Sequence, residues 1–426
     1  MKDTNIMFTE KDVLEYHLGG KIGLNVTKPL LGQRDLSIAY TPGVSFVCEA
    51  IKNAPEKDRI LTSKANLVAV ITDGSAVLGL GNIGPRASIP VMEGKAVLFK
   101  AFAGVDGWPL PIEHVSGEDG TPDVEKFIET VRRVSCMFGG INLEDIAAPA
   151  CFEIEERLDS ILDIPVFHDD QWGTAIITLA ALKNYCLITR KELSNIKVLI
   201  NGAGAAGLRI ADMLKTDGVE NCVICDSKGL LTDTRDDINK YKARHAVSGP
   251  SMGLAEAIKG ADVFIGVSVG GCLDETMVMS MASDPAIFAM ANPVPEILPE
   301  KVSSCMKGRS YVMATGRSDY PNQINNVLGF PFIFRGALDV RATRITMGMK
   351  VAASRALAEL AREGDVPVDV RKAYNRDFEF GRDYLIPTPF DSRLRVSVSL
   401  AVAEAAISDG VAKREELPEY ATENKK

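Results

Sequence analysis

From about residue 166 onward, short apolar runs alternate along the chain with segments that carry apolar residues at helical spacing. Runs of this kind, bounded by Gly, Pro, Asn or Asp, are typical of buried strands. They predict strands over residues 197–201, 222–226, 263–267, 286–290 and 311–314. Helices are predicted to begin near Ala205, Leu254 and Glu275. Because strands that alternate with helices are joined by right-handed crossovers, the pattern predicts an α/β fold with a doubly wound parallel sheet.

The chain before residue 166 has a less regular pattern, in which short apolar runs are separated by loops rich in Gly and Pro. Residues 66–74 and 141–146 are predicted to form strands, and Lys95 is expected between two apolar strands. Apolar residues recur at helical spacing over residues 124–134, and this helix is predicted to open at Thr121-Pro122, with Pro122 at the first helical position. We expect a second, smaller α/β unit here.

A chain of 426 residues exceeds the roughly 250–300 residues that one hydrophobic core usually supports, so two domains are expected. We predict an N-terminal catalytic α/β domain over residues 1–165 and a dinucleotide-binding domain over residues 166–390. A C-terminal helical tail is predicted over residues 391–426. Long helices are expected at Arg341–Arg362 and Arg395–Ile407.

Composition excludes several classes of partner. The 48 basic and 57 acidic residues give a formal charge of −9, which argues against a nucleic-acid surface. The longest apolar stretches fall well short of the roughly 20 residues that a membrane span needs, and the polar N-terminus lacks the apolar core of a signal peptide. We therefore expect a cytoplasmic protein. Cys222 and Cys225 lie in an apolar run, so a buried strand is favoured there over a redox or zinc half-site.

Two acidic pairs, Glu144-Asp145 and Asp169-Asp170, lie upstream of a glycine-rich segment. Carboxylates that cluster without Cys or His ligands suit a hard divalent cation, Mg²⁺ or Mn²⁺. Adjacent strand residues normally face opposite ways, so joint ligation by Glu144 and Asp145 requires an irregular backbone. The alternative is that one of these carboxylates points inward and the other is solvated.

The glycine-rich segment follows an apolar strand and opens a helix, as in dinucleotide-binding folds. The predicted cofactor contacts are Gly202, Gly204, Ala205, Ala206, Gly207, Asp226, Ser227, Lys228, Ser268 and Asn292. Asp226 would bind free ribose hydroxyls and so favour NAD, whereas Ser227 and Lys228 could receive the 2′-phosphate of NADP. Arg235 and Lys242 are further candidates that the sequence does not place. The choice between NAD and NADP stays open.

The sequence around Tyr40 and around Lys95 makes these two residues candidates for a catalytic role. Tyr40 precedes Thr41-Pro42-Gly43, where an aromatic beside a turn is the simpler interpretation. Lys95 would ordinarily be a solvated lysine, but its apolar neighbours and a nearby metal would lower its pKa enough for it to act as a base. The residues alone leave both alternatives open.

From about residue 10 to 405 the chain resembles the malic enzymes, specifically the short form common in bacteria. The shared motifs, in the family's order, include "AYTPGV", "TDGSAVLGLGNIGP", "PVMEGKA", "INLEDI", "FHDDQWGTA", "GAGAAG", "DSKG", "ANPVPEILP" and "TGRSDYPNQINNVLGFPFIFRGALD". The resemblance implies oxidative decarboxylation of (S)-malate to pyruvate and CO₂ with NAD or NADP and Mg²⁺ or Mn²⁺, decarboxylation of oxaloacetate as well, and a homodimer.

The resemblance also implies roles for individual residues. Lys95 would be the general base, Tyr40 the general acid, and Asp169 the residue that orients the lysine. The implied metal ligands are Glu144, Asp145 and Asp170. The implied substrate contacts are Asn292, Asn325 and Asn326.

The chain departs from the family's pattern at two positions. Ala76 stands where larger malic enzymes have an arginine for the substrate carboxylate, so the residue that holds the distal carboxylate of malate is not identified. Trp172 replaces the His or Gln that is common there, which we interpret as a packing change. Alternatives to the implied activity are a malate-to-lactate enzyme that retains NAD, a decarboxylase of oxaloacetate alone, and an inactive module that senses malate or nucleotide.

Overall fold

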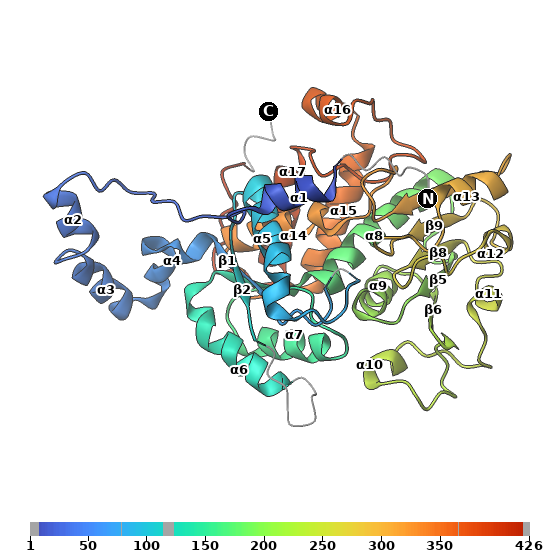
Figure 1. The fold of residues 1–426 in the computed structure, drawn as a ribbon, viewed down its shortest axis with the longest axis horizontal. Coiled ribbons are helices and arrows are strands. Elements are labelled where there is room, and N and C mark those ends of the chain that lie inside the picture. The colour runs from blue at the N-terminus through green and yellow to red at the C-terminus, as the bar shows by residue number, and fades with distance from the viewer. Residues whose placement is uncertain (1–7, 78, 114–122, 365, 421–426) are drawn as a thin grey trace.

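Two sheets organise the fold in the computed structural model, which describes residues 8–77, 79–113, 123–364 and 366–420 (Figure 1). The larger sheet has the order β10-β9-β8-β5-β6-β7. Its strands are β5 (Lys197–Asn201), β6 (Asn221–Asp226), β7 (Gly229–Leu230), β8 (Val263–Gly266), β9 (Ala286–Ala289) and β10 (Val312–Thr315). All neighbouring pairs are parallel except β6 and β7. The predicted parallel, doubly wound sheet is confirmed, with one short antiparallel strand added at its edge.

The helices around this sheet include the three whose starts, at Ala205, Leu254 and Glu275, the sequence predicts. They are α8 (Asp169–Thr189), α9 (Ala205–Thr216), α10 (Lys240–Ala243), α11 (Leu254–Ala257), α12 (Glu275–Met279) and α13 (Pro299–Cys305). Cys222 and Cys225 are free, buried thiols within β6, as the strand interpretation predicts. α8 is buried along most of its length because it packs against both α9 and the C-terminal helix α15 (Met347–Arg362).

The smaller sheet lies in the N-terminal part and has the order β2-β1-β3-β4, with parallel pairing throughout. Its strands are β1 (Leu67–Thr72), β2 (Asp106–Pro111), β3 (Gly140–Leu143) and β4 (Val166–His168). The accompanying helices are α5 (Gly84–Ala103), α6 (Val124–Val134) and α7 (Ala150–Ile161), with 3-10 turns η2 (Ser63–Asn66) and η3 (Ser135–Met137). Asp123 caps α6, and the predicted opening at Thr121-Pro122 lies outside the described residues.

The prediction that Lys95 lies between two strands is wrong, because residues 84–103 form one continuous helix, α5. This helix contains Pro90 and Gly94, both of which disfavour a helix interior. Tertiary packing overrides these preferences. The ring of Phe99 on α5 packs edge-on against Phe330 and Phe334, with ring centres 4.7 and 5.4 Å apart. The buried face of α5 therefore joins the N-terminal part to the C-terminal helices.

The C-terminal helices belong to the same hydrophobic core, except for α16, whose buried Val370 lies in a small separate cluster. They are α14 (Phe330–Asp339), α15, α16 (Val368–Tyr374) and α17 (Leu394–Ser408), preceded by the 3-10 turn η4 (Asn326–Leu328). α17 packs against α14 and α15, and buried residues from β1 to α17 form one continuous cluster. Among the residues that the structure describes, each helix is too short or too polar to cross a membrane.

An N-terminal arm has little contact with this core. It contains α2 (Gln33–Ala39), α3 (Val44–Asn53), η1 (Pro55–Lys57) and α4 (Asp58–Leu61), none of which has a buried residue. Figure 1 shows α2 and α3 extending away from the body, whereas α1 (Glu10–His17) lies over α5. Large apolar side chains that the arm and its approach expose include Leu24, Val26, Leu30, Leu31, Leu36, Ile38, Phe46 and Ile60.

Candidate active site

The acidic pairs meet where two neighbouring strands end. Leu143 at the end of β3 is in register with His168 at the end of β4, so Glu144 and Asp169 follow side by side. Asp145 has a left-handed backbone (φ 53°), which is the irregularity that joint ligation requires. Both Glu144 and Asp145 are only 4% exposed, so the alternative of one solvated carboxylate does not describe the structure. Asp170, in the first turn of α8, accepts a 2.7 Å hydrogen bond from the Asp145 backbone N–H.

Glu144, Asp145 and Asp170 can each turn one oxygen toward a common point, since these three atoms lie within 4.8 Å of one another. An all-oxygen set of carboxylates fits the ligand preference of Mg²⁺ or Mn²⁺. Together with Asp169 they bring four carboxylates to one site, against a single nearby ammonium group. The excess negative charge in a buried setting favours a bound divalent cation.

Lys95 supplies that ammonium group from the middle of α5. Its Nζ lies 2.6 Å from Asp169 Oδ2 and 2.8 Å from Glu144 Oε1. The same atom lies 4.2 Å from the centre of the Phe330 ring, so the lysine has an apolar wall on one side. The structure thus brings the predicted base, the residue predicted to orient it and one predicted metal ligand into direct contact.

Burial and the neighbouring carboxylates have opposite effects on the pKa of Lys95. Burial by itself lowers the pKa of Lys95, but Asp169, Glu144 and Asp170 together raise this pKa above its ordinary value. The sequence-based expectation of a lowered pKa included the charge of a bound metal cation as well as burial, so it stays a prediction. Burial raises the pKa of Glu144 and of Asp169, although Lys95 opposes the shift in both. Each carboxylate would be stabilised by additional positive charge.

The three predicted asparagines occupy different surroundings. Asn326 is closest to the cluster: its Nδ2 donates to the backbone carbonyl of Asp169 (3.2 Å), and its Oδ1 accepts from Thr174 Oγ1 (2.9 Å). Asn325 accepts a hydrogen bond from the Val327 N–H and so caps η4. Asn292 is exposed in the loop after β9. Ala76 donates its N–H to the carbonyl of Asp145 (3.0 Å) and contributes no charge toward the substrate.

The glycine-rich segment has the geometry of a phosphate-binding turn. Gly202 has a positive φ of 128°, and a Cβ atom on Gly207 would lie 1.8 Å from the Gly202 carbonyl oxygen. Gly204 is the N-cap of α9, so the backbone N–H groups of Ala205 and Ala206 lie in its first turn. Ser268, just beyond β8, accepts from Asn201 Nδ2 (2.8 Å) at the same sheet edge.

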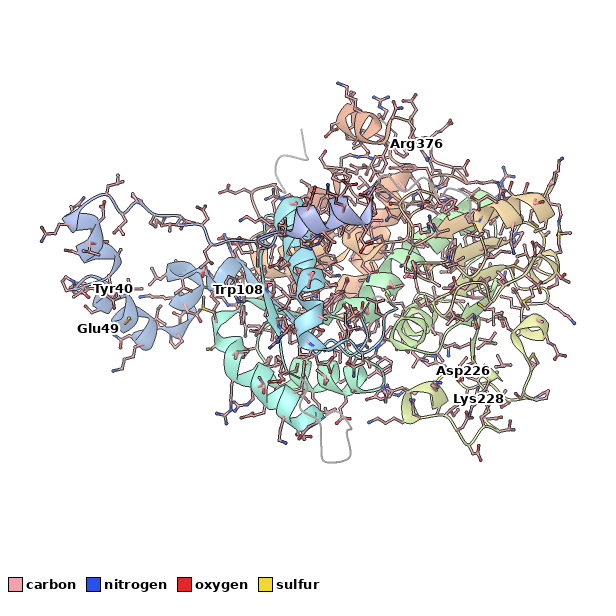
Figure 2. All side chains as sticks on the ribbon, viewed as in Figure 1. Tyr40, Glu49, Trp108, Asp226, Lys228 and Arg376 are labelled. Carbon is pink, nitrogen blue, oxygen red and sulfur yellow. The ribbon has the colours of Figure 1, made fainter. Side chains whose placement is uncertain are left out.

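The end of β6 carries more positive charge than the sequence indicated. Two cations, Arg235 and Lys242, bind the Asp226 carboxylate at 2.8 Å each. Burial raises the pKa of Asp226, but the hydrogen bonds from these two residues outweigh it and lower the pKa to about 2. Lys228 is different: its side chain is 67% exposed and its Nζ pairs with Asp237 (2.7 Å). Figure 2 shows Asp226 and Lys228 at the outer side of this domain.

Tyr40 does not reach Lys95 within one chain. It is the C-cap of α2 on the N-terminal arm, and its side chain is 69% exposed. Figure 2 shows it on the projecting arm, whereas α5, which carries Lys95, lies in the body. If Tyr40 is a general acid, it must therefore act in the active site of another chain.

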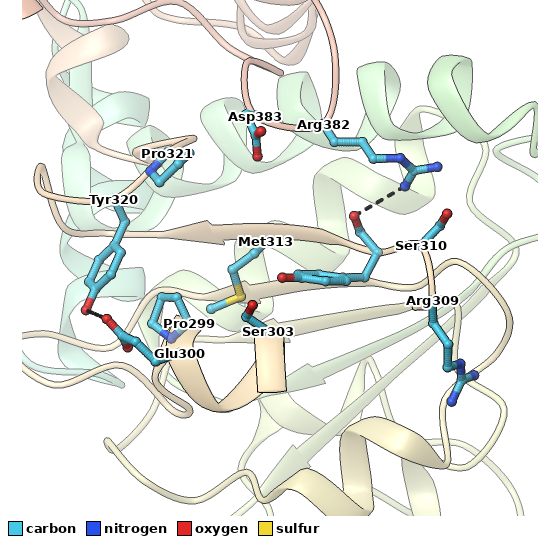
Figure 3. Close-up of a pocket in the computed structure, with 11 residues that line it drawn as sticks. Pro299, Glu300, Ser303, Arg309, Ser310, Met313, Tyr320, Pro321, Arg382 and Asp383 are labelled. Atoms are coloured by element: carbon cyan, nitrogen blue, oxygen red, sulfur yellow. Dashed lines mark hydrogen bonds between the residues drawn. The ribbon is translucent and has the colours of Figure 1, made fainter. Parts of the chain in front are cut away.

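A separate cavity of about 700 Å³ lies beside the edge strand β10 (Figure 3). Tyr320 Oη donates to Glu300 (2.9 Å) at one side of it, and Arg382 lines the opposite side. None of the predicted catalytic, metal or cofactor residues lines this cavity. Its walls mix acidic and basic groups, so it gives no chemical indication of a ligand.

Sequence reasoning missed Asn142, whose Nδ2 donates to Glu144 Oε2 (2.8 Å) from a fully buried position. The sequence pattern could have identified Asn142, because on a strand a residue two positions before Glu144 lies on the same face as Glu144. It also missed Glu155, Arg209 and Lys350, which surround Trp172 behind the acidic cluster. These come from three different helices, so their meeting is a property of the fold.

Two family models match most of the chain. Residues 172–370 match "Malic enzyme, NAD binding domain", and residues 19–115 and 110–159 match "Malic enzyme, N-terminal domain". The gap between these matches, residues 160–171, contains the end of α7, the strand β4 and the first residues of α8.

Individual proteins agree with these matches. The chain is 51% identical over 407 residues to the NADP-dependent malic enzyme of Halomonas elongata, and the aligned region covers 94% of each protein. It is 51% identical over 422 residues to that of Rhizobium meliloti, covering 97% of this chain but 54% of that protein, so it spans about half the length of some relatives. A crystal structure of malic enzyme from Pyrococcus horikoshii superimposes with a TM-score of 0.87 at 42% identity, covering 97% of this chain and 94% of that one.

Proposed function

Because this chain belongs to the malic enzyme family, we propose that it catalyses the oxidative decarboxylation of (S)-malate to pyruvate and CO₂, with reduction of NAD or NADP. One observation carries the proposal: the buried contact of Lys95 with Glu144 and Asp169 beside a three-carboxylate ligand set. An alcohol oxidation followed by loss of CO₂ needs a group that accepts the hydroxyl proton and a centre that stabilises negative charge. This cluster offers both.

The ligands of the metal would be Glu144, Asp145 and Asp170. A Mg²⁺ or Mn²⁺ ion held there supplies positive charge that acidifies the malate hydroxyl and stabilises the charge that develops on decarboxylation. Gly202, Gly204 and the first turn of α9 would hold the dinucleotide, whose nicotinamide would supply a hydride acceptor for the carbon that carries this hydroxyl.

The side chains divide the proton transfers between them. Lys95 takes the hydroxyl proton. Asp169 holds the lysine in place through its carboxylate, and Asn326 in turn donates to the backbone carbonyl of Asp169. Once Glu144 and Asp170 are engaged as ligands, they raise the pKa of Lys95 less, which frees the lysine to accept a proton. Tyr40 returns a proton to the enolate carbon and gives pyruvate. The same site would decarboxylate added oxaloacetate, because that step does not need the hydride transfer.

A product assay tests this function directly. Malate with Mn²⁺ and either NAD or NADP should yield reduced nicotinamide, pyruvate and CO₂ in equal amounts. Lactate without reduced nicotinamide in solution would identify a malate-to-lactate enzyme instead. Decarboxylation of oxaloacetate without oxidation of malate would identify a decarboxylase of oxaloacetate alone. Binding of malate or nucleotide without turnover would identify an inactive sensing module.

We infer a homodimer in which the arm of each chain packs on its partner. α2 and α3 bury no residue of their own, and the arm exposes a run of large apolar side chains that monomeric proteins rarely leave in water. The nearby edge strand β2 adds Trp108, which is 38% exposed (Figure 2). Packing of the arm across the interface would bring Tyr40 to Lys95 of the partner subunit and complete two equivalent sites.

Complementation between two inactive variants tests the shared site. Tyr40→Phe and Lys95→Ala chains, co-expressed with different tags, should form mixed dimers in which one of the two sites keeps both native residues. With random pairing, roughly a quarter of the sites are then native, so about a quarter of wild-type activity returns. If both residues act within one chain, the mixed dimer has no native site and stays inactive. Each variant expressed alone is the control.

Cofactor choice follows from the cation pair on Asp226. Arg235 and Lys242 neutralise this carboxylate and place positive charge where a 2′-phosphate would lie, so we propose that the chain accepts NADP. Lys242→Ala should raise the Michaelis constant for NADP by about 10- to 150-fold, equivalent to about 1.5–3 kcal/mol, with little change for NAD. Lys228→Ala is the matched control, because that ammonium pairs with Asp237. Equal losses for both cofactors would contradict the assignment.

Two further proposals concern the whole chain. The gap between the two family matches supports a domain boundary near residue 165. The packing of α17 on α14 and α15 supports placing this helix, which lies within the predicted C-terminal tail, in the helical layer of the second unit. We place the protein in the cytoplasm, since its cysteines are free thiols, which reducing compartments maintain.

A further inference from the structure

Glu155, on α7, is a buried carboxylate that no step of the proposed reaction uses. Its side chain is almost inaccessible, and it accepts two hydrogen bonds from the start of α8. The backbone N–H of His168 donates to Oε1 at 3.0 Å, and the indole Nε1 of Trp172 donates to Oε2 at 3.0 Å. These two donors flank Asp169 and Asp170 in the sequence. Glu155 therefore holds the segment that carries both acidic residues from either side.

Two buried cations accompany this carboxylate. The guanidinium of Arg209, on α9, lies 3.9 Å from Glu155 Oε2, 4.9 Å from the centre of the Trp172 ring, and donates to Gln171 Oε1 at 2.9 Å. The Nζ of Lys350, on α15, lies 3.6 Å from the centre of the same ring. Burial lowers the pKa of Lys350 to about 8, although Glu155 opposes the shift. The carboxylate thus balances charge as well as accepting hydrogen bonds, and Trp172 links it to both cations.

The geometry of the acidic site depends on the position of α8, because two residues in the first turn of this helix make contacts within the site. Asp169 contacts Lys95 at 2.6 Å, and Asp170 contacts the Asp145 backbone N–H at 2.7 Å. A displacement of about 1 Å at such a site can reduce catalysis by roughly 100-fold. Within the part of the chain that the structure describes, Glu155 is the acceptor for both the N–H of His168 and the indole N–H of Trp172, so its loss would leave two buried donors unpaired.

We propose that Glu155 is a positioning residue that fixes the first turn of α8, and with it Asp169 and Asp170, in the geometry that binds the metal. It touches neither substrate nor cofactor and acts through His168 and Trp172. The inference rests on the proposed function for the identity of the cation, but its test measures binding of Mn²⁺ and does not need turnover. It also gives Trp172 a specific role, in place of the packing change that its sequence position suggested.

Glu155→Gln is the direct test, because it keeps the shape but turns an amide N–H toward one of the two donors. Mn²⁺ affinity, measured from the free-ion electron paramagnetic resonance signal, should fall by about 10- to 100-fold, while NADPH affinity, measured by its fluorescence, stays unchanged. Glu153→Gln, on the same helix but with a partly exposed side chain that pairs with Arg157, is the matched control and should bind Mn²⁺ like the wild type. Trp172 fluorescence, recorded in a Trp108→Phe background, should be quenched by Mn²⁺ in the wild-type site.

A second variant separates positioning from general destabilisation. In Glu155→Gln, the glutamine amide N–H and the indole N–H of Trp172 would be two donors that face each other. Trp172→Phe removes the indole N–H, so the double variant Glu155→Gln/Trp172→Phe should bind Mn²⁺ more tightly than Glu155→Gln alone. Wild-type Mn²⁺ affinity in Glu155→Gln would overturn the proposal. Equal losses of Mn²⁺ and NADPH affinity, with no recovery in the double variant, would also overturn it by showing a merely structural role. Malate oxidation by the wild type tests the proposed function separately, whatever the variants do.

Discussion

Replacement of Asp170 by Asn is expected to reduce malate turnover by about 10²- to 10³-fold, the loss typical of removing one preorganised charge from a reacting centre. Asparagine keeps the shape of the side chain and one oxygen, but it removes a charge from a three-carboxylate site. The glycine-rich turn lies on separate elements, so the affinity for NADP should not change. Steady-state rates and cofactor titrations on the purified variant measure the two effects independently.

Asp369→Asn provides the matched control for Asp170→Asn, since Asp369 also occupies the first turn of a helix but is exposed. A chelator should abolish activity in the wild type, and added Mn²⁺ should restore it. Full activity in the presence of chelator would remove the metal from the mechanism altogether. A parallel loss of NADP affinity in Asp170→Asn would instead indicate that the substitution disturbs the fold.

Apart from the two-residue antiparallel strand β7, the strands of the larger sheet could be predicted almost residue by residue, because parallel strands are buried on both faces. Such strands appear in the sequence as uninterrupted apolar runs, and β5 and β8 are examples. The same reasoning failed for α5, where apolar runs around Lys95 indicated two strands. Short apolar runs do not distinguish a strand from a buried helix, and Pro90 and Gly94 made the helix less expected still.

The acidic cluster could be predicted for a related reason. Residues that follow adjacent parallel strands meet at one sheet edge, and the register of Leu143 with His168 produces this meeting for Glu144 and Asp169. Contacts that depend on the path of loops or on distant helices could not be predicted. The pairing of Lys242 with Asp226 and the position of Glu155 beside Trp172 are of this kind.

The Lys95 pKa shows that local sequence determines only part of the electrostatics of a buried group. Apolar flanks predict desolvation, and burial does oppose the charged form of this lysine. The carboxylates that surround it come from β3 and α8, far away in the sequence, and they reverse the direction of the shift. A lysine held charged in this way can act as a base only when its carboxylate neighbours are engaged elsewhere.

Lys95→Ala should therefore abolish malate oxidation, with a loss of at least about 10²- to 10⁴-fold, the range that general acid–base groups contribute. Lys95→Arg should not restore activity, because a guanidinium keeps its proton and cannot accept the one from malate. Asp169 would retain a cationic partner in Lys95→Arg, so this variant separates the loss of the base from the loss of the ion pair. Malate oxidation by Lys95→Arg at the wild-type rate would exclude Lys95 as the base.

Tyr40→Phe should have a different signature, because the tyrosine is proposed to act after the hydride has left. Its phenol exchanges a proton with the enolate carbon, so the variant should fail to exchange the methyl protons of pyruvate with solvent deuterium, a reaction that involves no reduction or oxidation. Nuclear magnetic resonance follows this exchange directly, with Tyr16→Phe, an exposed tyrosine on α1, as the control. Exchange by Tyr40→Phe at the wild-type rate would remove the tyrosine from the mechanism. Because Tyr40 lies on the arm, dilution of the wild type to monomers should abolish the same exchange, whereas a tyrosine acting within its own chain would remain active.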